Sequence, residues 1–146
     1  DIPLWAYIDL FTIANISFLY SISDINIKKT IAAEFSMKTA KGGAILEHFI
    51  HRMTIIRNLC AHGGRLYNRL FEQKPWLSKK EKSLLIRKDD GSLDNAHLYS
   101  FVIILKRLLS DNDFSSMKND IIALSNKYSF VHMKYYGFRD DWRVAL

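Results

Sequence analysis

The spacing of apolar residues constrains the fold of this chain more than any other feature. Nearly every apolar run repeats at intervals of three and four residues, the period of one helix face, rather than at the interval of two that a half-buried strand shows. The two prolines and six glycines fall mostly at the breaks between these runs. The sequence therefore predicts an all-α fold, a bundle of about five helices.

The helical segments can be placed from this periodicity and from residues that favour helix ends. Their approximate ranges are 3–20, 24–35, 43–70, 94–109 and 113–128. Proline suits the first turn of a helix, so the first segment is expected to begin near Pro3. Asp24 or Asn26 is expected to cap the second segment. Asp94 and Asp113 are expected to cap the last two.

The length and composition fit one domain. A chain of 146 residues, 49% of them apolar, can bury roughly two thirds of its unfolded surface, which is enough for a single core over residues 1–146. The apolar start lacks a basic leader and carries Asp9, which argues against a signal peptide or a membrane span. Cys60 is the sole cysteine, so no internal disulfide can form. We therefore expect a soluble, cytoplasmic protein without a membrane partner.

The stretch IIRNLCAHGGRLYNR, residues 55–69, gathers polar groups within a helical pattern. Residues 55–70 contain no acid, whereas a solvated helix face usually mixes Lys with Glu. The net charge of +6 and the pI of about 9.4 also favour an acidic partner, such as nucleic acid. The polar residues fall within an arc of about 140° on a helical wheel; they are Arg57, Asn58, His62, Arg65, Asn68 and Arg69.

The residue types on this face suit cleavage of a phosphodiester. An arginine presents a planar fork of donors that matches phosphate, and a histidine exchanges protons near neutral pH. A histidine base would withdraw the 2′-hydroxyl proton of RNA while arginine holds the charge on the phosphate oxygens. Arg57 and His62 lie about 140° apart around a helix, so a second copy related by a two-fold axis would complete the cleft. This scheme needs no metal and no cofactor.

Several segments resemble a known family. The run from Arg57 to His62 fits the R-x4-H motif of HEPN ribonuclease domains. The longer run RNLCAHGGRLYN resembles the R-N-x-x-A-H-x-x-R-L-x-N signature of Abi-like proteins, the abortive-infection phage-resistance family. The start IPLWAYIDLFTIANISFLY resembles the family's Pro-Leu-Trp helix, and the end YYGFRDDWRVAL resembles its closing G-F-x-x-x-W segment. Members of this family are longer and have an additional N-terminal helical part, so the chain resembles their C-terminal half.

The resemblance implies a HEPN-like helical bundle with Arg57 and His62 as the catalytic pair. Asn58 would orient the site, and Arg65 and Asn68 would bind or position RNA. The resemblance also implies a homodimeric endoribonuclease that halts the cell when phage infects. We expect it to act in abortive-infection phage defence or as a toxin, and an RNA or protein antitoxin is a candidate partner. The alternative is a non-catalytic module of the same fold that binds RNA or protein.

Other residue groups have two interpretations each. Glu47, His48 and His51 share metal-like spacings, but a further ligand is missing and an ion pair between Glu47 and His51 is preferred. Cys60 is assigned to core packing. The aromatic residues of the final segment either stack on bases or dock into the core, and docking is preferred because aromatics bury a large area; they are Tyr135, Tyr136, Phe138 and Trp142.

Residues 77–91 are expected to form a basic, partly helical connection that closes in a turn at Asp90 and Gly91. Its basic residues either follow RNA phosphates or form a solvated loop; they are Lys79, Lys80, Lys82, Arg87 and Lys88.

Overall fold

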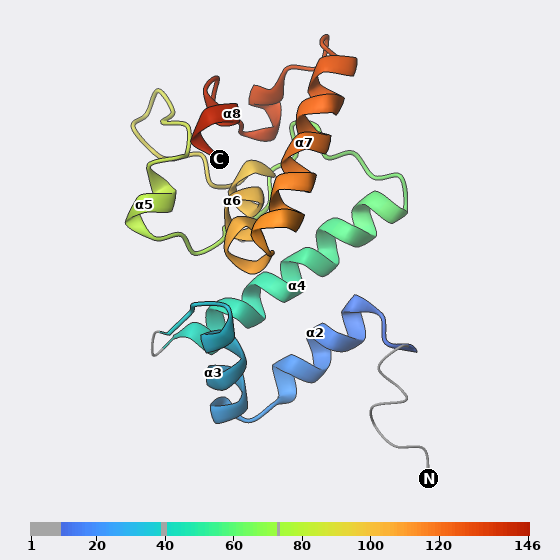
Figure 1. Cartoon of the computed structure of the whole chain (residues 1–146), viewed down its shortest axis with the longest axis vertical. Helices are drawn as coiled ribbons and strands as arrows, with labels where there is room; N and C mark the ends of the chain where they lie inside the picture. Colours follow the sequence, from blue (N-terminus) through green and yellow to red (C-terminus); the bar gives the residue numbers. More distant parts are fainter. Residues whose placement is uncertain (1–9, 39–40, 73) are drawn as a thin grey trace. The chain divides into compact units, whose positions relative to one another are not determined.

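The computed structural model describes residues 10–38, 41–72 and 74–146, and the regular structure in these ranges is helical (Figure 1). The only bridge between extended residues there is an isolated one, from Arg87 to Leu93. The all-α prediction is confirmed. Seven α-helices occur in the described ranges, whereas about five were expected. The two additional helices, α5 and α8, have one turn each and are too short to show an apolar period. The elements are α2 (Ile13–Ile22), α3 (Ile25–Glu34), α4 (Gly42–Ala61), α5 (Lys79–Lys82), α6 (Tyr99–Leu108), α7 (Asp111–Lys127), a 3-10 helix η2 (Met133–Tyr136) and α8 (Trp142–Ala145).

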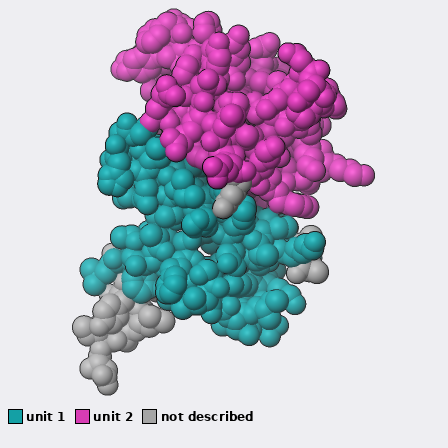
Figure 2. Space-filling view, turned by 180° about the vertical axis from the view of Figure 1, so that it is seen from behind, with its two compact units in different colours: residues 1–64 teal, residues 65–146 magenta. Residues whose placement is uncertain are grey.

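The chain divides into two compact units, residues 1–64 and residues 65–146 (Figure 2). Each unit has its own set of contacts, and the single domain expected over residues 1–146 stays a prediction. No helix in the described ranges combines the length and the apolar character that crossing a membrane requires.

In the first unit, α2 and α3 both pack against α4 (Figure 1). The buried Tyr20 of α2 ties the three helices together, because its hydroxyl donates to the carbonyl oxygens of Lys28 on α3 (3.0 Å) and Gly43 on α4 (3.2 Å). Burial, and secondarily the charge of Glu47, raises the pKa of Tyr20. The Lys28 ammonium lies 2.8 Å from a Glu47 carboxylate oxygen and so links α3 to α4 a second time.

Gly43 lets α3 approach α4 closely, and this contact gives a testable prediction. A Cβ at position 43 would lie 2.8 Å from the Lys28 Cβ and 3.2 Å from its carbonyl carbon. Gly43→Val is therefore expected to lower the free energy of unfolding by roughly 1–3 kcal/mol, the usual cost of overpacking. Urea denaturation measures this loss. The neighbouring Ala44 is exposed, so Ala44→Val is the matched control, expected to change stability by about 0.5 kcal/mol or less. An equal loss in both variants would contradict the close-approach argument.

The predicted helix boundaries of the first unit are partly right. Asp24 caps α3 by accepting the Asn26 amide at 2.7 Å, as expected. The continuous helix expected from Pro3 to Tyr20 is wrong in its described part, because Thr12 and Asn15 form a reciprocal capping box that starts α2 at Ile13. The portion expected over residues 3–9 lies outside the described residues.

In the second unit, α6 is the core helix. Six consecutive positions, 99–104, are buried, and all but Ser100 are hydrophobic, so this part of α6 is buried on all sides. Aromatic rings gather against it, with Phe71 on Phe101 (centroids 5.1 Å apart) and Phe138 on Tyr99 (4.5 Å apart). Burial raises the pKa of Tyr99 to about 12.

The starts of α6 and α7 differ from the prediction. α6 begins at Tyr99 rather than near Asp94. Asp94 does not cap it, because both carboxylate oxygens lie within 2.8 Å of the His97 Nδ1 atom. α7 is capped by Ser110, whose hydroxyl accepts the Asp113 amide, so Asp113 lies in the first turn instead of at the cap. Both helices otherwise follow the predicted ranges.

Candidate functional site

The helix that carries the Arg-x4-His motif ends at the motif. α4 spans Gly42–Ala61, and His62 is its C-cap. Gly63 adopts a left-handed φ of 67°, its amide donates to Cys60 O, and the Gly64 amide donates to Leu59 O at 2.7 Å. This pair of hydrogen bonds is a Schellman motif, the glycine-dependent way to end a helix.

The continuous helix expected from Gly43 to about Leu70 is therefore wrong, and so is the single polar stripe along it. Glycine accepts the left-handed conformation without the steric cost that other residues incur. The helical-wheel placement holds for Arg57 and Asn58, which lie within α4, but not for Arg65 and Asn68, which lie beyond its end.

Arg57 and His62 both lie on the surface, near the C-terminal end of α4. Both side chains are exposed, and Asn58 is half-buried. The Arg57 guanidinium donates to the Asn58 amide oxygen at 3.2 Å, so the amide orients the guanidinium from the next position. An exposed guanidinium and an exposed imidazole five positions apart can reach a substrate from solvent.

Arg65 and Asn68 lie at the start of the second unit, in a segment outside any helix. Asn68 is exposed and adopts a left-handed φ of 53°. The backbone N–H of Asn68 donates to the Tyr135 carbonyl oxygen at 2.9 Å, and the backbone N–H of Arg69 donates to the Leu66 carbonyl oxygen. The Tyr67 ring packs against the Tyr135 ring at a centroid distance of 5.1 Å. Asn68 therefore has a conformational role in this turn.

That conformational role gives a prediction. Asparagine and glycine tolerate a left-handed backbone, whereas a β-branched residue does not. Asn68→Gly is expected to retain the free energy of unfolding within about 0.5 kcal/mol, and Asn68→Val to lose about 1–2 kcal/mol. Chemical denaturation of both variants beside the parent chain measures the difference. If Asn68→Gly lost as much stability as Asn68→Val, the amide side chain and not the backbone would be the stabilising feature.

The contacts of α4 decide between the interpretations given above for Glu47, His48, His51 and Cys60. Glu47 pairs with Lys28 rather than with His51, so the expected Glu47–His51 ion pair is wrong. Burial, followed by the positive charges of Arg52 and His51, lowers the pKa of His48. The described residues contain no group of three side chains able to hold a metal ion. Cys60 is exposed one residue before α4 ends, so the prediction that it packs in the core is wrong.

Two of the four aromatic residues singled out near the end of the chain dock into the second unit. Phe138 and Trp142 are each 3% exposed, with ring centroids 5.0 Å apart. The preferred docking interpretation is confirmed for these two. Tyr135 is more exposed and packs on Tyr67 (5.1 Å). Partial burial, and then the neighbouring Tyr135 and Tyr136, raises the pKa of Tyr67.

Two features near the motif were missed from the sequence. Arg52 on α4 is 3% exposed, and nothing in the apolar spacing singles out this arginine as buried. The attachment of Tyr67 and Asn68 to Tyr135 was also missed, because it joins positions far apart in the chain.

The structure is an all-α protein with an exposed Arg-x4-His pair at the end of a helix. A family model of the Abi-like proteins matches residues 1–68. The resemblance to the Abi-like family is confirmed over this segment, which contains the whole run from Arg57 to Asn68. The closing G-F-x-x-x-W resemblance, at 137–142, lies outside the match and stays a prediction. No curated protein and no solved structure matches the chain significantly.

Proposed function

We propose that the chain is a HEPN-type, metal-independent endoribonuclease in which Arg57 and His62 are the catalytic pair. One observation carries the proposal: both side chains are exposed at the end of α4, inside the segment that matches the Abi-like family. The net charge of +6 is favourable for an RNA substrate. The kinship favours a role in abortive-infection phage defence, as a toxin with an RNA or protein antitoxin.

The cleavage step follows from the residue types. The His62 imidazole takes the proton of a ribose 2′-hydroxyl, and the 2′-oxygen attacks the adjacent phosphorus. The bond from phosphorus to the 5′-oxygen breaks as the new bond forms, which leaves a 2′,3′-cyclic phosphate. The departing 5′-oxygen takes a proton from a second acid. Arg57 balances the charge on the non-bridging phosphate oxygens, and Asn58 holds its guanidinium.

The need for a second acid is the reason to propose a homodimer. Positions 57 and 62 lie about 140° apart on a helix, so a two-fold copy of the α4 end would supply the other histidine. Analytical ultracentrifugation over the concentrations used for cleavage tests this arrangement. A strictly monomeric chain that cleaves at full rate would contradict the dimeric site but not the catalytic pair.

The direct test is incubation of the purified protein with end-labelled RNA in excess EDTA. We expect fragments that end in a 2′,3′-cyclic phosphate, identified by their resistance to phosphatase until acid opens the ring. If the protein binds RNA and leaves it whole, while Arg57→Ala and His62→Ala bind equally well, the non-catalytic binding module is the correct function.

A further inference from the structure

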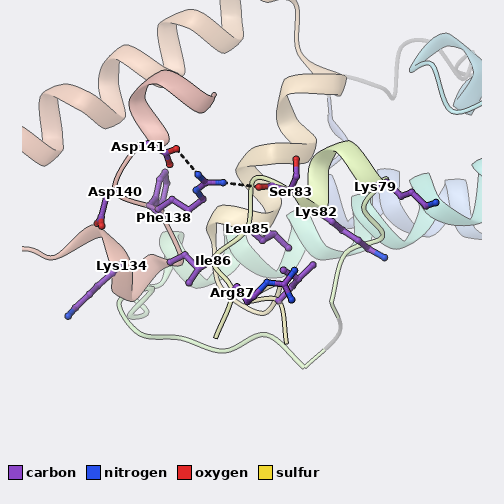
Figure 3. Close-up of a pocket in the computed structure, with 12 residues that line it drawn as sticks. Lys79, Lys82, Ser83, Leu85, Ile86, Arg87, Lys134, Phe138, Asp140 and Asp141 are labelled. Carbon is purple, nitrogen blue, oxygen red and sulfur yellow. Dashed lines mark hydrogen bonds and ion pairs between the residues drawn. The ribbon is translucent and has the colours of Figure 1, made fainter. Parts of the chain in front are cut away.

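The second unit holds a wide basic pocket that the proposed nuclease pair does not use. Its volume is about 960 Å³, at the upper end of the range for small-molecule sites. Three segments build it: α5 with its C-cap Ser83, the turn after it, and the segment 134–141. Figure 3 shows Lys79 and Lys82 on one side of the view and Lys134 on the other. Its basic residues are Lys79, Lys82, Arg87, Lys134 and Arg139.

The two lysines of α5 are available to an anion because the acid of that helix faces elsewhere. Glu81 accepts from Arg107 and, through the capping box, from the Ser78 amide at 2.7 Å. Burial acts to raise the pKa of Glu81, but the Ser78 hydrogen bonds and the Arg107 charge outweigh it and lower the pKa. The side chains of Lys79 and Lys82 are exposed, and neither ammonium has an ion-pair partner among the residues that the structure describes.

The walls of this pocket are fixed in place. The Arg139 guanidinium donates to the Ser83 carbonyl at 2.8 Å and to an Asp141 carboxylate oxygen at 2.6 Å (Figure 3). These bonds tie the end of α5 to a segment 56 residues later in the chain. Arg139 neutralises Asp141 in the same contact, so the nearby acid does not cancel the charge of the α5 lysines.

The remaining lining residues distinguish a nucleotide from a simple polyanion. Ile86 and Leu93, both half-buried, line the pocket above the buried Leu85 and Phe138. This apolar floor offers a surface to a base. Asp140 is exposed at the pocket, where its carboxylate can accept hydrogen bonds from ribose hydroxyls. A site for inorganic anions alone would gain nothing from an apolar floor and an unpaired acid.

We propose that this pocket binds a nucleotide, with Lys79 and Lys82 on its phosphates and the base over the apolar floor. The site is separate from Arg57 and His62, and the proposal does not rest on the nuclease activity. The nucleotide can come from a free mononucleotide or from a single-stranded RNA, because both present the same phosphate, ribose and base.

The test uses the whole 146-residue chain with the His62→Ala substitution, which is expected to leave RNA intact. Binding of ATP is measured by calorimetry, and binding of a labelled eight-nucleotide oligoadenylate by fluorescence anisotropy. Lys79→Gln/Lys82→Gln is compared with Lys74→Gln/Lys80→Gln, a control with the same net charge whose lysines lie outside the pocket lining. We expect the pocket variant to bind about tenfold more weakly and the control to stay within about twofold. For oligoadenylate, the association constant of the pocket variant should depend less steeply on salt. The slope of its logarithm against the logarithm of the salt concentration should become shallower by about 1.4, or about 0.7 for each lysine that no longer neutralises a phosphate.

The possible results distinguish a free nucleotide from an RNA strand as the ligand, and they include results that overturn the proposal. Binding of ATP that depends on the pocket lysines supports a free nucleotide as ligand, and pocket-dependent binding of oligoadenylate alone supports an RNA strand. The proposal is overturned if neither probe binds, if both double variants weaken binding equally, or if an oligoglutamate peptide competes as well as oligoadenylate. Circular dichroism verifies that each variant is folded. Loss of cleavage in the EDTA assay bears on the nuclease proposal alone, since this binding is measured on a His62→Ala background.

Discussion

Replacement of His62 with alanine is expected to lower the single-turnover rate of RNA cleavage by about 10²- to 10⁴-fold, the usual contribution of a positioned general base. The side chain is exposed at the C-cap of α4, so its removal leaves the folded chain intact. Rapid-quench measurement with saturating protein reports the chemical step directly. RNA affinity, measured in parallel by anisotropy, should change by less than about threefold, because a proton-transfer group contributes mainly in the transition state.

His51→Ala is the matched control for this experiment. His51 is also an exposed histidine of α4, so the control has the same change of side chain in the same helix, and it should retain full activity. An equal loss of rate in the two variants would mean that the assay follows a general property of the helix and not a base at position 62. A rate unchanged in His62→Ala would remove the histidine from the mechanism.

Local rules of sequence account for much of the first unit. α3 was predictable because Asp24 is a typical N-cap and the apolar period resumes directly after it. The end of α4 was not obtained from periodicity, because the polar spacing continues from Arg57 to Arg69 as though the helix did. The deciding feature is Gly63, whose left-handed φ ends the helix whatever the pattern beyond it. A rule that treats adjacent glycines as a helix end would have placed the boundary correctly.

The candidate site divides in the same way between local and long-range features. The proximity of Arg57 to Asn58 and the surface position of His62 follow from one helix end, so a motif in sequence predicts them. The pocket of the second unit depends on the bond from Arg139 to Ser83, which joins residues far apart in the chain. The sequence singled out Lys79, Lys82 and Arg87 as a basic group, but no local pattern indicates which distant residues complete their surroundings.

Replacement of Arg57 with alanine is expected to lower the cleavage rate by about 10²- to 10³-fold, the typical loss when one group that stabilises a developing oxyanion is removed. Arg57→Lys should lie between the alanine variant and the parent chain, because lysine keeps the charge but lacks the planar fork that binds two phosphate oxygens. The free energy of unfolding should change by about 0.5 kcal/mol or less in both variants, since the guanidinium is exposed and its hydrogen bond is to the adjacent Asn58. Single-turnover cleavage and urea denaturation measure the two quantities.

Arg69→Ala is the control that separates the geometry at position 57 from charge alone. Arg69 is exposed, lies in the same acid-free stretch and carries the same charge, but it follows the end of α4 by several residues. Its removal should weaken RNA binding slightly and leave the cleavage rate at saturating protein unchanged. If Arg69→Ala slowed cleavage as much as Arg57→Ala, the arginines would contribute only through the overall positive field. Arg57 would then have no specific role in the transition state, although the chain would still cleave RNA.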